Sequence, residues 1–260
     1  MRRSEVNGYI LYDGPSMIDG EPIVAIATGF KRPSANPKTG PMIQTWIIRS
    51  DMRPATAINE GADESICGQC PMKGWIEQQS EGSVNRGRSC YVAVQNAPTG
   101  VYDGYLNDSY EVLEPQNVQR LFRWHRLRLG AYGDPVAVPF PIWSSILKNV
   151  QGHTGYTHQW REPRFWRFKR ILMASVETET EAKIAQAKGW RTFRSRPVGS
   201  PLAEGEIECP ASEKMGYRTT CDHCLHCDGA TNKRKFFSIA IEAHGGKGVL
   251  SNYDKMISTI

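Results

Sequence analysis

Residues 171–196, ILMASVETETEAKIAQAKGWRTFRSR, contain the alternation on which the fold prediction depends. Residues 171–176 form an apolar run that indicates a buried strand. Residues 178–188 predict a helix, because acidic side chains occupy the first turn and Gly189 follows the last. Residues 190–196 indicate the next strand. This strand–helix–strand order is typical of a βαβ unit in a parallel sheet.

The same alternation extends along the chain in both directions. Further elements are expected, with strands at 127–133, 153–158 and 235–244 and helices at 54–65, 114–124 and 141–150. Residues 22–30 and 41–50 predict an N-terminal hairpin, and residues 1–21 an irregular start. Residues 89–94 read as one more strand. The predicted fold is therefore α/β: a β/α barrel, complete or incomplete, with a hairpin before it.

Composition and net charge limit the classes of protein to which the chain can belong. The chain has 260 residues, and its 40% hydrophobic and 23% charged content is that of an ordinary globular protein rather than a disordered one. We expect a single domain, 1–260, that includes a cysteine-rich metal-binding appendage at 205–235. There is no long apolar run and no signal-peptide core, so we expect no membrane span and a cytoplasmic protein. The net charge of +5 is compatible with nucleic acid or a small anion as a partner.

The C-terminal cysteines form the clearest motif. Cys221, Cys224 and Cys227 have CxxCxxC spacing, and Cys209 stands upstream with Pro210 after it. In a reducing compartment such spacing indicates metal ligands rather than disulfides. A CxxCxxC run completed by a distant Cys-Pro resembles [4Fe–4S] ligation, whereas four thiolates also suit zinc. The alternatives of an iron–sulfur cluster and zinc therefore stay open.

A second group of cysteines lies upstream, at Cys67, Cys70 and Cys90. Three thiolates leave one ligand position open, which suits a reactive cluster or a zinc ion completed by another ligand. A CxxC beside an unrelated buried cysteine is the alternative. Cys209 could also complete this group in place of the C-terminal one.

Polar residues at the predicted strand ends are the candidate catalytic residues. They are Asp134, His158, Glu177 and His244, with Arg194 and Arg196 at a further strand end. In a barrel these strand ends meet at one rim, where chemistry takes place. His158 and Glu177 are candidates for proton transfer or for hydrogen bonds to a substrate. Caps and surface ion pairs are the structural alternative.

Residues 160–170, WREPRFWRFKR, interleave cations with aromatic side chains. A groove for single-stranded nucleic acid uses this composition, with arginines on phosphates and rings on bases. We favour the alternative of an amphipathic helix with its aromatic side chains in the core.

Several of these motifs together resemble a known group of proteins. They are the cysteine trio ending in Cys90-Tyr91, Gly133-Asp134, residues 153–158 and 174–177, Cys209-Pro210-Ala211 and the closing CxxCxxC. They are similar to uncharacterised cysteine-rich bacteriophage proteins, which in turn look like relatives of radical-SAM-type barrels. The resemblance implies a reactive [4Fe–4S] cluster on Cys67, Cys70 and Cys90 that S-adenosylmethionine completes. It implies an auxiliary cluster on the other four cysteines.

The chain departs from the radical-SAM pattern in spacing, because nineteen residues separate Cys70 from Cys90. It also has no Gly-Gly-Glu strand to hold the methionine moiety.

The leading hypothesis is an iron–sulfur enzyme of phage type. It would perform radical or redox chemistry on a nucleotide or nucleic acid, with a redox partner and in a host cytoplasm. The alternative is a zinc-stabilised protein without catalysis that binds nucleic acid or a host protein. A third hypothesis is a metal-dependent nuclease that uses Asp134, Glu177 and His244.

Overall fold

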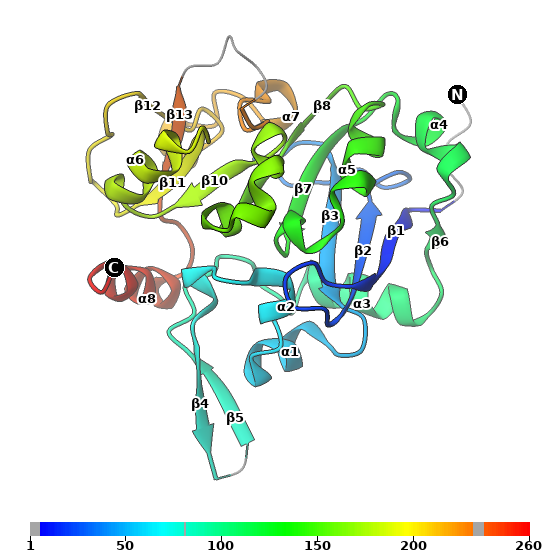
Figure 1. Ribbon diagram of the computed structural model, residues 1–260, viewed down its shortest axis with the longest axis horizontal. Coiled ribbons are helices and arrows are strands. Elements are labelled where there is room, and N and C mark those ends of the chain that lie inside the picture. Colours follow the sequence, from blue (N-terminus) through cyan, green and yellow to red (C-terminus); the bar gives the residue numbers. More distant parts are fainter. Residues whose placement is uncertain (1–5, 81, 231–236) are drawn as a thin grey trace.

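The computed structural model describes residues 6–80, 82–230 and 237–260, and these form a mixed α/β protein (Figure 1). The strands are β1 (Gly8–Pro15), β2 (Pro22–Thr28), β3 (Ile43–Arg49), β4 (Trp75–Gln79), β5 (Gly82–Arg86), β6 (Glu111–Val112), β7 (Arg126–Tyr132), β8 (Gly152–Thr154), β9 (Tyr156–Thr157), β10 (Met173–Val176), β11 (Thr192–Arg196), β12 (Glu206–Glu208) and β13 (Ser238–Glu242).

Helices connect most of these strands. The α-helices are α1 (Pro54–Glu60), α2 (Glu64–Cys67), α3 (Ala97–Leu106), α4 (Val118–Phe122), α5 (Phe140–Leu147), α6 (Glu179–Ala187), α7 (Cys221–Cys224) and α8 (Lys247–Ile257). Short 3₁₀ helices are η1 (Pro71–Lys73), η2 (Pro115–Asn117), η3 (Pro135–Ala137), η4 (Gln159–Arg161), η5 (Pro163–Arg170) and η6 (Glu213–Met215). In the described part of the chain, no helix has both the length and the apolar character needed to cross a bilayer.

The strands form two larger sheets and a separate β4–β5 hairpin. The first sheet has the order β6-β1-β2-β3-β7-β8 and the second the order β12-β13-β11-β10-β9. β3, β7 and β8 run parallel in the first sheet, and β9, β10, β11 and β13 run parallel in the second. Because β8 and β9 belong to one short stretch of chain, the parallel order continues from one sheet into the other.

The chain passes from the first sheet to the second at Gly155. This residue separates β8, which pairs with β7, from β9, which pairs with β10. A Cβ atom at this position would lie 2.5 Å from Cδ2 of Leu172 and 2.9 Å from Cβ of Leu129. Only glycine therefore lets these two leucines pack against the backbone where the strand changes sheets.

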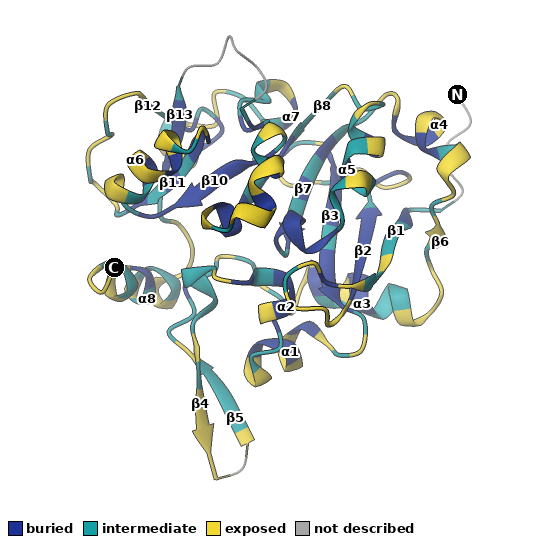
Figure 2. Ribbon diagram, viewed as in Figure 1, coloured by how far each residue is buried: buried dark blue, intermediate teal, exposed yellow. Residues whose placement is uncertain are grey.

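The core lies along the buried faces of the sheets (Figure 2). β2 and β3 are rich in isoleucine, and Ile23, Ile26, Ile43 and Ile47 are fully buried. Such β-branched side chains suit strands that are covered on both faces. Helix α6 begins with the expected polar cap, in which the Thr178 side chain accepts from Glu181 N and the Glu181 side chain accepts from the backbone of Thr178.

The βα alternation predicted for residues 127–196 is confirmed by β7, α5, β8, β9, β10, α6 and β11. The predicted N-terminal hairpin is confirmed by the antiparallel pairing of β2 with β3. No closed barrel is found among the described residues, because β6 and β12 end the two sheets without joining. Residues 235 and 236 of the predicted last strand, and residues 231–235 of the predicted appendage, lie outside the described residues.

Other sequence-based predictions were wrong. Residues 89–94 form no strand, although their composition favours one, because backbone groups of Ser89 and Cys90 bond to Met72 O instead of a neighbouring strand. The expected irregular start contains β1, which pairs with β2 through a bulge between Ile10 and Tyr12. This bulge breaks the regular alternation that would have indicated a strand.

The basic and aromatic segment forms η4 and η5. Trp160, Phe165 and Phe168 are buried in the core, whereas Arg164 and Arg167 are exposed. This burial agrees with the amphipathic interpretation that the sequence favoured.

Gly155→Ala tests the packing at the passage between the sheets. We expect the free energy of unfolding to fall by about 1–3 kcal/mol, because the added methyl group overpacks the contact with Leu129 and Leu172. Denaturant unfolding measures the change. Gly100→Ala is the matched control: it lies in α3 with open space around its Cβ position. This control should be neutral or stabilising by up to about 1 kcal/mol, and equal losses in both variants would contradict the packing argument.

Candidate functional site

A cavity of about 210 Å³ lies against one face of the parallel strands. Alternate residues of each strand line it, such as Arg128, Gly130 and Tyr132 of β7 and Phe193 and Ser195 of β11. Side chains two positions apart in a strand share a face, so the sheets present one continuous wall. Val249, Leu250 and Tyr253 of α8 cover the cavity from the other side.

Cys67, Cys70 and Cys90 all line this cavity. Burial raises the pKa of the Cys67 thiol well above its ordinary value, and the neighbouring Asp63, Cys70 and Cys90 raise it further. Burial also raises the pKa of the Cys90 thiol. Cys70 raises it further, whereas Arg88 lowers it. The three thiols therefore line the same cavity and act on one another electrostatically.

The β4–β5 hairpin explains the long gap between Cys70 and Cys90. The chain leaves the body of the protein at Trp75, turns, and returns at Arg86, which pairs with Trp75 (Figure 1). At its base, backbone N–H groups of Ser89 and Cys90 both donate to Met72 O, at 3.0 Å. Cys90 is thus held close to the CxxC turn in space.

Gln159 holds the CxxC turn against the strand ends. Its Nε2 donates to Cys67 O at 3.0 Å, and its Oε1 accepts from Gln69 N at 3.1 Å. Gly68 lies between these contacts with φ +51°, and a Cβ atom there would lie 2.5 Å from Oε1 of Gln159. Glycine is therefore required both by the backbone angle and by the close approach of Gln159.

Asp134 fixes the end of β7 to the end of β9. Its carboxylate accepts hydrogen bonds from Val136 N at 3.1 Å, and from Thr157 Oγ1 and His158 N at 2.9 Å each. Its own N–H donates to Ile66 O at 2.6 Å, just before the cysteine turn. Burial raises the pKa of Asp134. Because protein donors occupy its carboxylate oxygens, Asp134 positions the neighbouring segments and does not itself react with a substrate.

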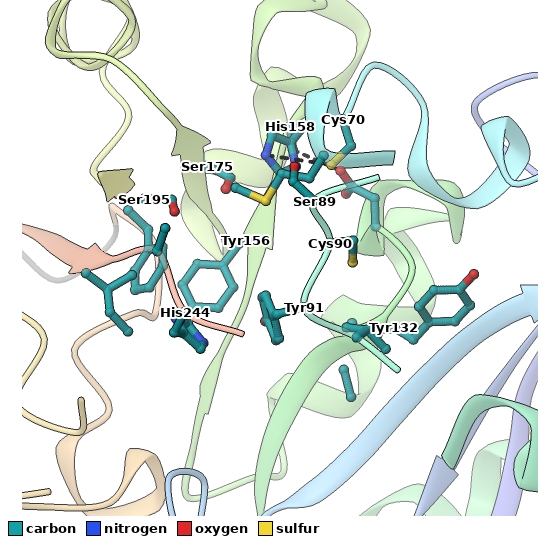
Figure 3. Close-up of a pocket in the computed structure, with 18 of the residues that line it drawn as sticks. Cys70, Ser89, Cys90, Tyr91, Tyr132, Tyr156, His158, Ser175, Ser195 and His244 are labelled. Carbon is teal, nitrogen blue, oxygen red and sulfur yellow. Dashed lines mark hydrogen bonds between the residues drawn. The ribbon is translucent and has the colours of Figure 1, made fainter. Parts of the chain in front are cut away.

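The partly buried His158 pairs with the buried Glu177, and Figure 3 shows His158 beside Cys70. Nε2 of His158 lies 2.9 Å from Oε1 of Glu177 and 3.9 Å from Sγ of Cys70. Burial alone would lower the pKa of His158, but Cys70 and Glu177 outweigh it and raise the pKa well above its ordinary value. The imidazole can therefore hold a proton at neutral pH where it faces the cavity.

Two buried polar atoms beside the cysteine trio lack a partner within the described residues. They are the hydroxyl of Tyr132 and Nη2 of Arg88. Both residues contribute to the electrostatics of Cys67 and Cys90, so they lie beside the same thiols. Buried donors without partners are costly and uncommon in native proteins. They are the donors that a sulfur-rich, negatively charged group at the trio would satisfy.

The other four cysteines form a second group on the far side of Tyr156. Burial raises the pKa of the Cys227 thiol, and Cys209, Cys221 and Cys224 raise it further, whereas a hydrogen bond with Tyr156 lowers it. Cys209 and Cys227 pack in a small apolar cluster with Met173, Ile239 and Ile241. Cys209 therefore belongs with the CxxCxxC motif and not with the upstream trio.

The remaining candidates lie apart from the cluster of Asp134, His158 and Glu177, although His244 also lines the cavity. His244 is exposed, and its ring lies 5.0 Å from that of Tyr91, apart from His158 (Figure 3). Arg194 pairs with buried Glu206, and Arg196 pairs with Glu208, so both arginines tie β11 to neighbouring structure on the face away from the cavity. The structure thus brings together Asp134, His158 and Glu177 but not His244, which separates the three proposed nuclease residues.

Two cations of the cavity, Arg128 and Lys38, were not predicted as site residues from the sequence. The signal was present in residues 126–129, Arg-Leu-Arg-Leu, whose alternation places arginines on the face opposite to buried leucines. Lys38 had no such signal, because it lies in the loop before β3.

The comparisons with known proteins found no matching family model, no matching curated protein and no matching solved structure. Within residues 6–80, 82–230 and 237–260, no three histidine, cysteine, aspartate or glutamate side chains are already arranged as a complete metal-binding set.

Asp134→Asn tests the anchor of the cysteine turn. In the variant, an NH₂ group replaces one carboxylate oxygen and faces hydrogen-bond donors that this oxygen accepts from in the wild type. We therefore expect the free energy of unfolding to fall by about 1–3 kcal/mol. Asp103→Asn removes an exposed carboxylate paired with Arg53 and should change stability by less than about 0.5 kcal/mol. Urea unfolding of both variants measures the difference, and an unchanged Asp134→Asn protein would show that the anchor is not structural.

Proposed function

We propose that the protein is an iron–sulfur enzyme whose redox or radical chemistry takes place in the cavity. The observation that carries this proposal is the gathering of Cys67, Cys70 and Cys90, without a fourth cysteine, where the parallel strands end. The parallel order that continues through β8 and β9 supports an open β/α barrel, in which strand ends form the reactive rim.

The donor chemistry of the trio fits a [4Fe–4S] cluster. Three thiols supply three ligands, and the cavity supplies space at the fourth position. The unpartnered Tyr132 hydroxyl and Arg88 Nη2 are hydrogen-bond donors of the kind that stabilise cluster sulfurs and tune their potential. When bound, such a cluster supplies one-electron chemistry.

The chain's own residues contribute position and a proton. Asp134 and Gln159 hold the cysteine turn against the strand ends, so the turn does not depend on the cluster for its place. His158, kept in place by Glu177, can donate or accept a proton at Nε2 on the cavity wall. Tyr132, Tyr156 and Phe193 supply aromatic surface to the cavity wall.

The group Cys209, Cys221, Cys224 and Cys227 offers four thiols and no open position. An auxiliary [4Fe–4S] cluster and a structural zinc ion both suit this set. Zinc in both groups would favour the second function, a zinc-stabilised protein that binds nucleic acid or a host protein.

Metal analysis of two cysteine variants tests the assignment. Wild-type protein purified without oxygen should be brown, absorb near about 400 nm and contain about eight irons per chain, or about four with zinc in the second group. Cys70→Ser should lose the iron of the trio alone, and Cys224→Ser the metal of the second group alone, because the two sets share no ligand. Each variant is thus the control for the other.

Colourless protein that carries zinc in both groups would refute the iron–sulfur assignment. Loss of all metal from either single variant, in a protein that remains folded by circular dichroism, would refute two independent groups.

S-adenosylmethionine is the cosubstrate that the resemblance implies, and an open position at the trio makes its binding testable. We expect equilibrium dialysis to show binding to iron-loaded wild-type protein and to Cys224→Ser, and loss of binding in Cys70→Ser. Equal binding by metal-free protein would show that the cosubstrate does not bind through the trio.

A further inference from the structure

The cavity carries positive charge near Tyr91 and His244 that is not paired with a carboxylate of the described residues. Arg128 of β7 lines the cavity, and the only hydrogen-bond partner of its guanidinium among the described residues is the Tyr91 hydroxyl, at 3.1 Å. A guanidinium has five N–H donors, so most of them remain available to a ligand. Removing such a charge from water without an anionic partner is costly.

Lys38 also lines this part of the cavity. Both Lys38 and Arg128 act on Cys221, lowering its pKa against the larger raising effect of burial. Both also act on His244, whose pKa is lowered by burial and by the two cations, against the raising effects of the Glu242 backbone and the Glu213 carboxylate. Neither cation forms an ion pair with a carboxylate in the part of the chain that the structure describes. Two cations thus line one part of the cavity without a carboxylate of the described residues in ion-pair contact with either of them.

The walls beside these cations are apolar and aromatic. Tyr156 packs against Phe193, with ring centroids 4.4 Å apart, and Ile241 continues this wall. Tyr91 and His244 also line the cavity, with tilted rings whose centroids lie 5.0 Å apart (Figure 3). The cavity volume of about 210 Å³ is below the range of about 300–1,000 Å³ typical of sites for drug-sized ligands. The occupant is therefore a small molecule, or the small end of a larger one.

We infer that the cavity binds a small organic anion, whose carboxylate or phosphate group lies against Arg128 and Lys38 and whose flat apolar body lies between Tyr156 and Tyr91. An Arg and a Lys together suit either anionic group, because the guanidinium offers paired donors and the ammonium a point charge. Such an anion would be the substrate class of the proposed enzyme. The inference rests on the proposed function only in so far as it takes the cavity to be the substrate site.

A different role for the two cations is to stabilise thiolates of the second cysteine group. The position of Arg128 argues against this as its sole role, because its guanidinium donates to the hydroxyl of Tyr91, the residue directly after Cys90, and not to a thiol of the second cysteine group. The experiment below separates the two roles by measuring anion binding and metal content independently.

Isothermal titration calorimetry with phenyl phosphate, benzoate and neutral benzyl alcohol tests the inference on the full chain, both as purified without oxygen and after metal removal. We expect both anions to bind and benzyl alcohol to bind at least tenfold more weakly. Arg128→Gln should weaken anion binding about tenfold to a hundredfold, since a hydrogen-bonded charge is lost. Lys38→Gln should weaken it several-fold, and Arg128→Lys should retain part of it.

Arg167→Gln is the matched control, because it removes the same charge from the exposed outer surface. Its anion binding should equal that of the wild type. Binding of benzyl alcohol as tight as that of the anions, or unchanged anion binding by both Arg128→Gln and Lys38→Gln, would overturn the inference. Unchanged anion binding with loss of metal from the second cysteine group would assign Arg128 to the thiolates and overturn it as well.

The two proposals fail in different ways. Anion binding that depends on Arg128 in a protein without iron would support the cavity as an anion site while refuting the iron–sulfur assignment. Iron-loaded protein that binds no anion would do the reverse.

Discussion

Close packing around Gly155 is the constraint on which the rest of the structure depends. Because no side chain projects from this residue, Leu129 and Leu172 meet the backbone there, and one short strand can pair with β7 before it and β10 after it. The two sheets consequently share a face, and that face forms the wall of the cavity. Arg128 belongs to this wall and His158 and Glu177 follow its strands, whereas Lys38 and the cysteine trio line the same cavity from segments outside the two sheets.

Much of this arrangement could be predicted from local sequence. The strands and helices of residues 127–196 follow from apolar runs and helix caps, which are local signals. The β4–β5 hairpin and α8 were missed because their sequences carry no such signal: β4 is largely exposed, and α8 places only Tyr253 fully in the interior. Nor does the sequence indicate that β8 and β9 divide one strand between two sheets, since that depends on leucines distant along the chain.

The candidate reactive residues of the site could be predicted from the sequence, whereas the residues that hold them in place could not. Cysteine spacing and polar strand ends indicated the trio and the Asp134–His158–Glu177 cluster. The sequence could not assign Cys209, because both groups had room for it; the packing of Cys209 with Met173 and Cys227 decides the matter. Gln159, Tyr132 and Arg88 were missed, since their importance comes from contacts across the fold that leave no pattern in neighbouring residues.

The base of the β4–β5 hairpin has a broader consequence. Trp75 pairs with Arg86, and the backbone of Cys90 bonds to Met72, so the distance between Cys70 and Cys90 in space does not depend on how many residues the hairpin contains. Related chains could lengthen, shorten or replace the hairpin without disturbing what lies beneath it. A sequence pattern that requires a constant gap between the second and third cysteines would overlook every such relative, whereas a pattern that allows a closed insertion of any length after the second cysteine would include them.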